Sequence, residues 1–173
     1  ETLPFQFSAH ILHEDGSYTH KEWLNVEDRV PTLPFIRELR KALGDVGSVL
    51  VFTSYENRIL SEAIRLLNRL HHDESKEERE WITELLNSDR IVDQHDWVHR
   101  FYFRPQMGGR TSIKVVLPAV WKNNPSLHSH EYFKRYFSEK DGEILDPYKT
   151  LPAANLGVTP IQVREGCGAM QGY

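Results

Sequence analysis

Residues 48–56 read Ser48-Val49-Leu50-Val51-Phe52-Thr53-Ser54-Tyr55-Glu56, and this stretch decides the fold class. Four consecutive apolar residues between serine and threonine are typical of a buried strand, and we expect it to be central in its sheet. Apolar residues at helical spacing follow at once, from Tyr55 to about Leu70, and predict an amphipathic helix. A buried strand that leads directly into such a helix favours an α/β fold.

The residues before this stretch predict a strand hairpin and a helix. Apolar and polar residues alternate over 5–12, the turn signal Glu14-Asp15-Gly16-Ser17 follows, and 17–23 completes the hairpin. A helix is expected over 31–43, with Gly44 at the position of its C-cap.

The residues after the central stretch are predicted to be mostly helical. Pro118 is expected to kink or end a helix that begins near Ile113. Further helices are expected at 76–87, 91–99 and 126–137, whereas 138–160 is expected to be loop and 161–163 a short strand. The whole order of elements indicates the α/β class.

Composition indicates a globular protein of one domain. The chain has 173 residues and a net charge of −4, which argues against a mainly electrostatic nucleic-acid binder but allows a carboxylate-rich metal site. A single cysteine, Cys167, excludes an internal disulfide framework and a Cys-rich zinc site. No run approaches the ~18 apolar residues of a membrane span, so we expect a cytoplasmic protein without membrane contact. Because the chain begins at Glu1 rather than Met, we expect a piece of a longer protein.

The first candidate site is Glu56, which follows the expected buried strand at the start of a helix. Open α/β sheets bind ligands at the carboxyl ends of their strands, and a carboxylate there can hold a divalent metal ion. The alternative is that Glu56 only stabilises the helix through the helix dipole.

The second candidate site is Gly108-Gly109-Arg110-Thr111-Ser112-Ile113-Lys114. Two glycines let the backbone approach a ligand closely, and Arg110, Ser112 and Lys114 are suited to contact phosphate beside a helix N-terminus. The stretch is not a P-loop, because the Gly-Lys-Ser/Thr order is absent. The alternative is a surface loop in which Ser112 caps the helix.

The third candidate site is a histidine pair, His95 and His99, which helical spacing would place on one face. Two such residues can bind zinc if a third ligand comes from elsewhere in the chain. The alternative is a solvated helix face, and no His-Glu-x-x-His pattern is present.

Six motifs taken together show a resemblance that spans nearly the whole chain. The series resembles an uncharacterised bacterial domain family that is similar to the DnaQ-like (DEDD) exonucleases and often follows a Cas4/RecB-like nuclease region. Its most specific part is the Ser-Ile-Lys-x-x-Leu-Pro segment. The motifs are Pro4-Phe5-Gln6-Phe7-Ser8-x-His10, Val51-Phe52-Thr53-Ser54-Tyr55-Glu56, Asp93, Thr111-Ser112-Ile113-Lys114-x-x-Leu117-Pro118-Ala119, Asp146-Pro147-Tyr148-x-x-Leu151-Pro152 and Gly166-x-x-Ala169-Met170.

The resemblance implies a ribonuclease H-like fold, a mixed sheet flanked by helices, in a single domain over 1–173 that is incomplete at both ends. It also implies a site of acidic residues. Glu1 would be the second acid of an Asp-x-Glu pair, and Glu56 would be the third acid, where the family pattern has Asp. Asp93 matches a further acidic position, and the last acid would lie beyond Tyr173.

The chemistry that the resemblance implies is hydrolysis of phosphodiester bonds in DNA or RNA by two Mg²⁺ or Mn²⁺ ions, in the 3′–5′ direction. Glu1 and Glu56 would bind metal, and Arg110, Ser112 and Lys114 would hold substrate phosphate. Tyr55 or the aromatic run 101–103 is suited to stack on a terminal base, although core packing is expected for at least two of those three aromatics.

Three functions therefore stand as hypotheses from the sequence. The first is a metal-dependent exonuclease, whose partners are nucleic acid and a Cas4/RecB-like nuclease region in the same polypeptide. The second is a non-catalytic domain of the same fold that binds nucleic acid or protein. The third is a zinc-dependent hydrolase that uses His95 and His99.

Overall fold

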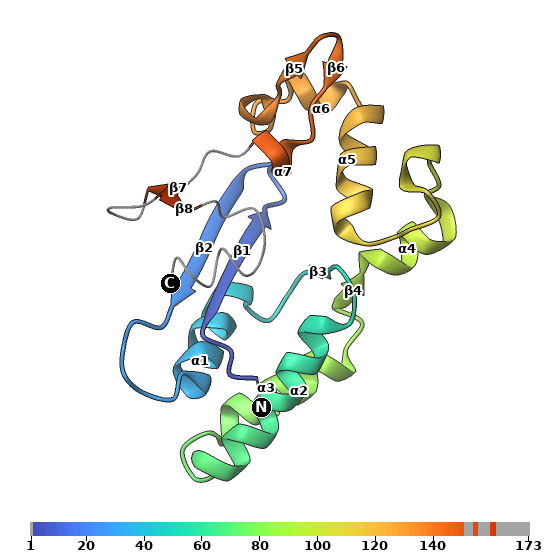
Figure 1. Ribbon diagram of the computed structural model, residues 1–173. Coiled ribbons are helices and arrows are strands. Elements are labelled where there is room, and N and C mark those ends of the chain that lie inside the picture. Colours follow the sequence, from blue (N-terminus) through green and yellow to red (C-terminus); the bar gives the residue numbers. More distant parts are fainter. Residues whose placement is uncertain (1, 151–153, 156–159, 162–173) are drawn as a thin grey trace. The chain divides into compact units, whose positions relative to one another are not determined.

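The computed structural model describes residues 2–150, 154–155 and 160–161 of the chain (Figure 1). The chain forms two compact units, Glu1–Trp97 (unit 1) and Val98–Tyr173 (unit 2). The elements are a mixture of helices and small sheets, so the α/β class is confirmed. The single domain over 1–173 stays a prediction, because two compact units can still be parts of one domain.

Unit 1 begins with a hairpin and a helix. Strand β1 (Gln6–Leu12) pairs antiparallel with β2 (Tyr18–Leu24), and His10 lies opposite His20. Helix α1 (Thr32–Leu43) follows, and the Gly44 N–H donates to the Arg40 carbonyl, as expected of its C-cap. The hairpin packs on α1 through Phe7 and Trp23, whose rings meet Phe35 edge-on at 5.9 and 6.0 Å.

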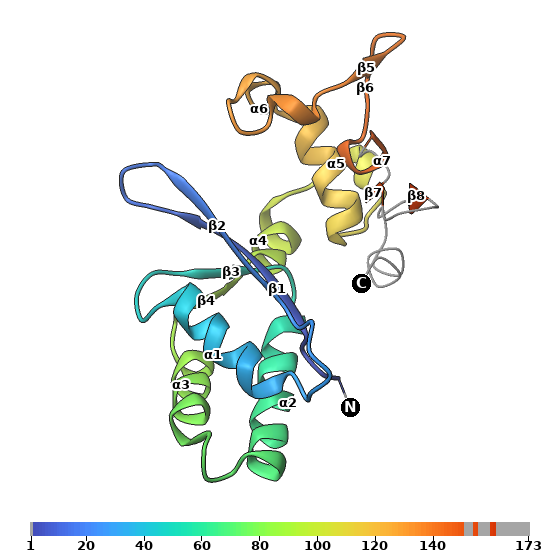
Figure 2. The ribbon, with the colours of Figure 1, turned by 90° about the vertical axis from the view of Figure 1, so that its left-hand side faces the viewer.

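A parallel strand pair and two long helices complete unit 1. Strand β3 (Val49–Val51) leads into α2 (Tyr55–Leu70) and α3 (Lys76–Asn87), and β4 (Ile91–Asp93) then pairs parallel with β3. Helices α1, α2 and α3 lie against one another in both ribbon views (Figure 2). Helix α4 (Gln94–Phe101) begins in unit 1 and ends in unit 2.

The core of unit 1 lies where these three helices meet. Amphipathic spacing puts one face of each helix into it, as the sequence predicts. Burying these side chains removes apolar surface from water, which is the main stabilising contribution to such a unit. The buried cluster contains Leu33, Phe35, Ile36, Leu60, Ala63, Leu67, Trp81, Ile82 and Leu85.

A charged contact joins α1 to α3 at the edge of this core. The Arg37 Nε–H donates to Glu78 Oε1 at 2.7 Å, and a second Arg37 N–H donates to the Glu74 carbonyl at 3.2 Å. The hydrogen bond to Glu78 raises the pKa of Arg37 above its usual value. Glu78 is almost fully buried, so its charge needs this partner in order to be tolerated inside the unit.

Unit 2 is built from short elements around one longer helix. That helix is α5 (Ile113–Asn123), and it continues past Pro118, so the proline does not end it. Short elements precede and follow it: η1 (Pro105–Met107), α6 (Ser126–Ser129), η2 (Lys134–Tyr136), the hairpin of β5 (Glu139–Lys140) and β6 (Glu143–Ile144), α7 (Pro147–Thr150), and the pair of β7 (Ala154–Asn155) and β8 (Pro160–Ile161).

Four sequence predictions differ from these elements. β3 is only three residues long and Leu50 is 56% exposed, so it is not a buried central strand in the described part of the chain. The helix predicted over 91–99 is a strand followed by a helix. The helix predicted over 126–137 is two short turns, and the loop predicted over 138–160 contains a hairpin, a short helix and strand β7. Of the strand predicted over 161–163, residue 161 belongs to β8, and 162–163 lie outside the described residues.

Candidate functional site

The carboxyl ends of β3 and β4 lie side by side, because the two strands are parallel with Val51 opposite Asp93. Asp93 joins these ends. Its Oδ1 accepts the Thr53 N–H at 2.8 Å, from the residue that leaves β3, and the His95 N–H at 2.9 Å, from the first turn of α4. His95 also packs edge-on against Phe52 at 5.6 Å. One carboxylate therefore fixes the path of both chain segments that leave the strands.

The backbone at Thr53 is strained. Its φ is +83°, a region that β-branched residues rarely adopt. Such a conformation costs about 1–3 kcal/mol and persists where surrounding contacts determine it. The hydrogen bond to Asp93 is the contact that holds the Thr53 amide in place.

Glu56 lies three residues after Thr53, in the first turn of α2. Its side chain is exposed and forms no hydrogen bond or ion pair with the described residues. Its position allows favourable interaction with the helix dipole and leaves both carboxylate oxygens accessible to a ligand. Its neighbour Tyr55 is 52% exposed, and the Arg58 guanidinium lies 5.0 Å from the ring centroid. Glu1 lies outside the described residues.

Arg90 positions β3, and nothing in the sequence analysis singled it out. Its guanidinium donates to four backbone carbonyls at the end of α1 and in the loop that leads to β3: Leu43 at 3.2 Å, Gly44 at 3.0 Å, Val46 at 2.9 Å and Gly47 at 2.8 Å. Its own carbonyl accepts the Val49 N–H at 2.7 Å. A lone arginine before a strand carries no sequence signal for such a role, because its partners are backbone atoms more than forty residues away.

The histidine pair of α4 has no further metal ligands beside it in the described part of the chain. No cluster of three or more His, Cys, Asp or Glu suited to a metal ion occurs there. His95 is half-buried and His99 is exposed.

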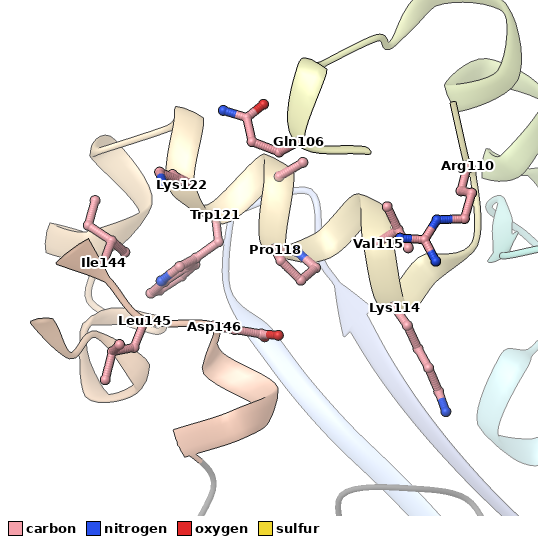
Figure 3. Close-up of a pocket in the computed structure, with 11 residues that line it drawn as sticks. Gln106, Arg110, Lys114, Val115, Pro118, Trp121, Lys122, Ile144, Leu145 and Asp146 are labelled. Atoms are coloured by element: carbon pink, nitrogen blue, oxygen red, sulfur yellow. The ribbon is translucent and has the colours of Figure 1, made fainter. Parts of the chain in front are cut away.

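The second candidate site of the sequence forms one wall of a pocket in unit 2. Gly108 and Gly109 have φ values of +55° and +75°, which other residues seldom adopt, and they turn the chain from η1 towards α5. Arg110 and Lys114 line a cavity of about 340 Å³ (Figure 3). Ser112 begins α5 as predicted, but its hydroxyl makes no capping hydrogen bond, and it does not belong to the lining.

The cavity also has a polar and aromatic lining that the motif did not predict. Lys122 and Trp121 come from the far end of α5, and Asp146 comes from the segment after β6. Figure 3 shows the Trp121 ring extending from α5 towards the segment that carries Ile144, Leu145 and Asp146. The sequence analysis expected Pro118 to kink or end this helix and 138–160 to be loop, so it gave no reason to join these residues to Arg110.

The first two thirds of the chain match a known protein family. Over residues 1–112 the chain matches a family described as a domain of unknown function, DUF2779. The chain belongs to this family. The matched residues include all of unit 1 and the glycine turn of unit 2, and they end at Ser112. No curated protein and no solved structure matches the chain.

The aromatic run after α4 differs from its prediction. Phe101 is 79% exposed and Phe103 is 68% exposed, so core packing of at least two of the three rings is wrong. Tyr102 is half-buried, and Arg104 lies 5.5 Å from its ring centroid. The alternation of the run places two benzyl groups in water, where they are available to a partner.

None of the helices in the described part of the chain combines the length and the apolar character that crossing a bilayer requires.

Proposed function

We propose that this DUF2779 chain is part of a divalent-metal-dependent nuclease of the ribonuclease H-like, DnaQ-like type, which hydrolyses single-stranded DNA or RNA from the 3′ end. The order of unit 1 supports this proposal: an antiparallel hairpin, a helix, and two parallel strands joined by helices. The observation that carries it is the hydrogen bond that the Thr53 N–H donates to Asp93, because it joins the carboxyl ends of two parallel strands just before Glu56.

The carboxylates of this strand end suit Mg²⁺ or Mn²⁺. Magnesium keeps several waters and is usually bound by one or two carboxylates together with substrate phosphates. Glu56 is exposed, and Asp93 Oδ2 accepts no hydrogen bond from the described residues. A bound ion would polarise the scissile phosphate and activate water. Asp93 would orient the strand ends, Glu56 would contribute a carboxylate, and the resemblance adds Glu1 to them.

Nucleic acid is the substrate class that the exposed side chains of unit 2 favour. Exposed Phe101 and Phe103 stand between Arg100 and Arg104, and aromatic residues interleaved with arginines are suited to stack on unpaired bases. Arg110 and Lys114 supply positive charge for phosphate, with Ser112 between them. The resemblance adds a Cas4/RecB-like nuclease region in the same polypeptide as the proposed partner.

A second candidate function is nucleic-acid binding without hydrolysis. It is favoured by the two backbone N–H groups that already occupy Asp93 Oδ1, since this is a structural use of the carboxylate. The zinc-dependent hydrolase stays a third hypothesis, and elemental analysis of the purified protein for stoichiometric zinc tests it.

The deciding experiment measures cleavage of end-labelled single strands by the full chain with Mg²⁺ or Mn²⁺. Glu56→Gln is expected to lower the rate by about 100-fold, the upper range for groups that support a metal site. Asp93→Asn keeps an oxygen acceptor for both amides but loses the charge, so it should lose activity and remain folded. Glu84→Gln, an exposed carboxylate of α3, is the matched control.

The outcomes separate the candidates. Metal-dependent cleavage that is lost in Glu56→Gln and retained in Glu84→Gln supports the nuclease. Cleavage that survives Glu56→Gln removes this residue from the site. Binding of single strands without any cleavage supports the second candidate, and the absence of both binding and cleavage would exclude the two together.

A further inference from the structure

The pocket beside α5 carries an excess of positive charge. Arg110, Lys114 and Lys122 line it, and Asp146 is its one carboxylate. None of the three cationic side chains forms an ion pair or hydrogen bond with the described residues. Asp146 Oδ1 accepts the Tyr148 N–H at 3.0 Å at the start of α7. The lining therefore sets three cationic groups against one carboxylate.

The start of α5 increases this excess. Its first turn contains no acidic residue, and Lys114 stands there beside the positive end of the helix dipole. A cation at this position is electrostatically unfavourable, and a bound anion would relieve it. Helices α2 and α3 differ, since each carries glutamate in its first turn.

The pocket also has an aromatic and apolar wall. The Trp121 ring lines the cavity, but Trp121 is only 4% exposed and its Nε1–H is buried out of reach of a ligand. Val115, Pro118 and Leu145 supply apolar surface to the rest of the lining. A ligand with an apolar part between its anionic groups matches this lining.

The spacing of the cations indicates the form of the ligand. Lys114 and Lys122 lie eight residues apart on α5, which corresponds to about 12 Å along the axis. Figure 3 shows Arg110 and Lys114 at one end of the lining and Lys122 at the other. A single phosphate cannot take full advantage of both ends, whereas two phosphates of one backbone can.

We propose that this pocket binds a short segment of single-stranded nucleic-acid backbone, with one phosphate at Arg110 and Lys114 and another at Lys122. The sugar or base between them packs on the apolar wall beside the Trp121 ring. A cavity of about 340 Å³ lies at the lower end of the range for small-ligand pockets, which suits one or two nucleotides rather than a duplex. The choice of nucleic acid among polyanions rests on the proposed function.

The test titrates the full chain with a 5′-phosphorylated thymidine dinucleotide, which carries two phosphates, in EDTA so that no hydrolysis can occur. Lys114→Gln and Lys122→Gln are each expected to weaken binding by about threefold to tenfold at low salt. Each should also lower the slope of log affinity against log salt by about 1, which is the signature of one lost phosphate contact. Lys140→Gln, an exposed lysine of β5, is the control and should change neither quantity.

Two further measurements keep the outcome specific to the pocket. The indole N–H resonance of Trp121, assigned with Trp121→Phe, should shift on saturation with the dinucleotide. Thymidine 5′-monophosphate should bind more weakly than the dinucleotide, and thymidine should not bind. The proposal is overturned if Lys122→Gln leaves affinity and salt slope unchanged, if the Trp121 resonance does not move, or if thymidine binds as tightly as the dinucleotide. Failure of the nuclease proposal would appear separately, as absent cleavage with metal.

Discussion

Unit 1 and unit 2 use their apolar side chains differently. In unit 1, nine buried residues from three helices form one cluster, and Phe7 and Trp23 of the hairpin pack against it. In the described residues of unit 2, only Met107, Val116, Ala119 and Trp121 are buried apolar side chains, while Phe101 and Phe103 lie in water. Unit 1 therefore has the packing to hold a precise geometry at its strand ends, and unit 2 offers accessible cations and aromatic rings.

The largest expected effect comes from breaking the core of unit 1. Ile82 is fully buried in α3, so Ile82→Ala should lower the free energy of unfolding by about 2–5 kcal/mol. Val116→Ala in α5 should cost less, because it removes fewer carbons and lies in a unit with four buried apolar side chains among its described residues. Urea denaturation, followed by amide hydrogen exchange in each unit, checks both values. Equal losses in the two variants would contradict the contrast between the units.

A smaller effect is expected from removing the arginine that positions β3. Arg90→Gln loses most of the hydrogen bonds to the carbonyls of 43–47 and should cost about 2 kcal/mol, since bonds to charged groups contribute about 1.5–3 kcal/mol each but do not add. Exchange of the Val49 amide, which donates to the Arg90 carbonyl, is the local measurement. Faster exchange at Val49 with unchanged exchange in α3 would show that Arg90 stabilises β3 locally and does not stabilise the helical core of unit 1. Arg65→Gln, an exposed arginine of α2, is the control, and an equal effect there would count against this role.

The smallest effect is expected at the hairpin tip, the part of unit 1 outside its core. Hydrogen bonds from the Ser17 hydroxyl and N–H lower the pKa of Asp15 below its usual value. A lowered folded-state pKa stabilises the tip at pH values above the unfolded pKa, which is about 3.9, and this contribution is lost as pH falls through the folded pKa. An NMR titration of Asp15, with exchange at Gly16 and Ser17, measures it. Asp15→Asn should remove the pH dependence, and an unshifted Asp15 titration would show that the bonds do not form.

The sequence predicted the long helices and the hairpin well because each has its own periodicity. Helices 55–70 and 76–87 carry apolar residues on one face, and their boundaries agree with the prediction. Strand β4 was not predicted, because two apolar residues, Ile91 and Val92, are too few to show the alternation of a strand. They form a strand because they pair with β3. The exposure of Leu50 could not be predicted either, because an apolar run does not show how many neighbouring strands cover it.

The candidate sites were predictable only in part, for a related reason. The sequence placed Arg110 and Lys114 together because they are neighbours in the chain, and in the structure both line one pocket. Lys122 and Asp146 line the same pocket because α5 continues past Pro118 and because the segment after β6 lies against it. Residue spacing in the sequence predicts neither arrangement. Asp93 was named on resemblance alone, and its two backbone hydrogen bonds are a property of the folded strand ends.

The strained backbone at Thr53 would link the shape of the chain to metal binding at the strand end. One carboxylate oxygen of Asp93 holds the amide of Thr53, the residue with a positive φ at the exit of β3. In the proposed nuclease, a cation that drew this oxygen away would release the Thr53 amide, and relaxation of its backbone would offset part of the lost hydrogen bond. Cation binding at Asp93 and the path of the chain into Glu56 would then be one coupled equilibrium, in which each biases the other by the same amount.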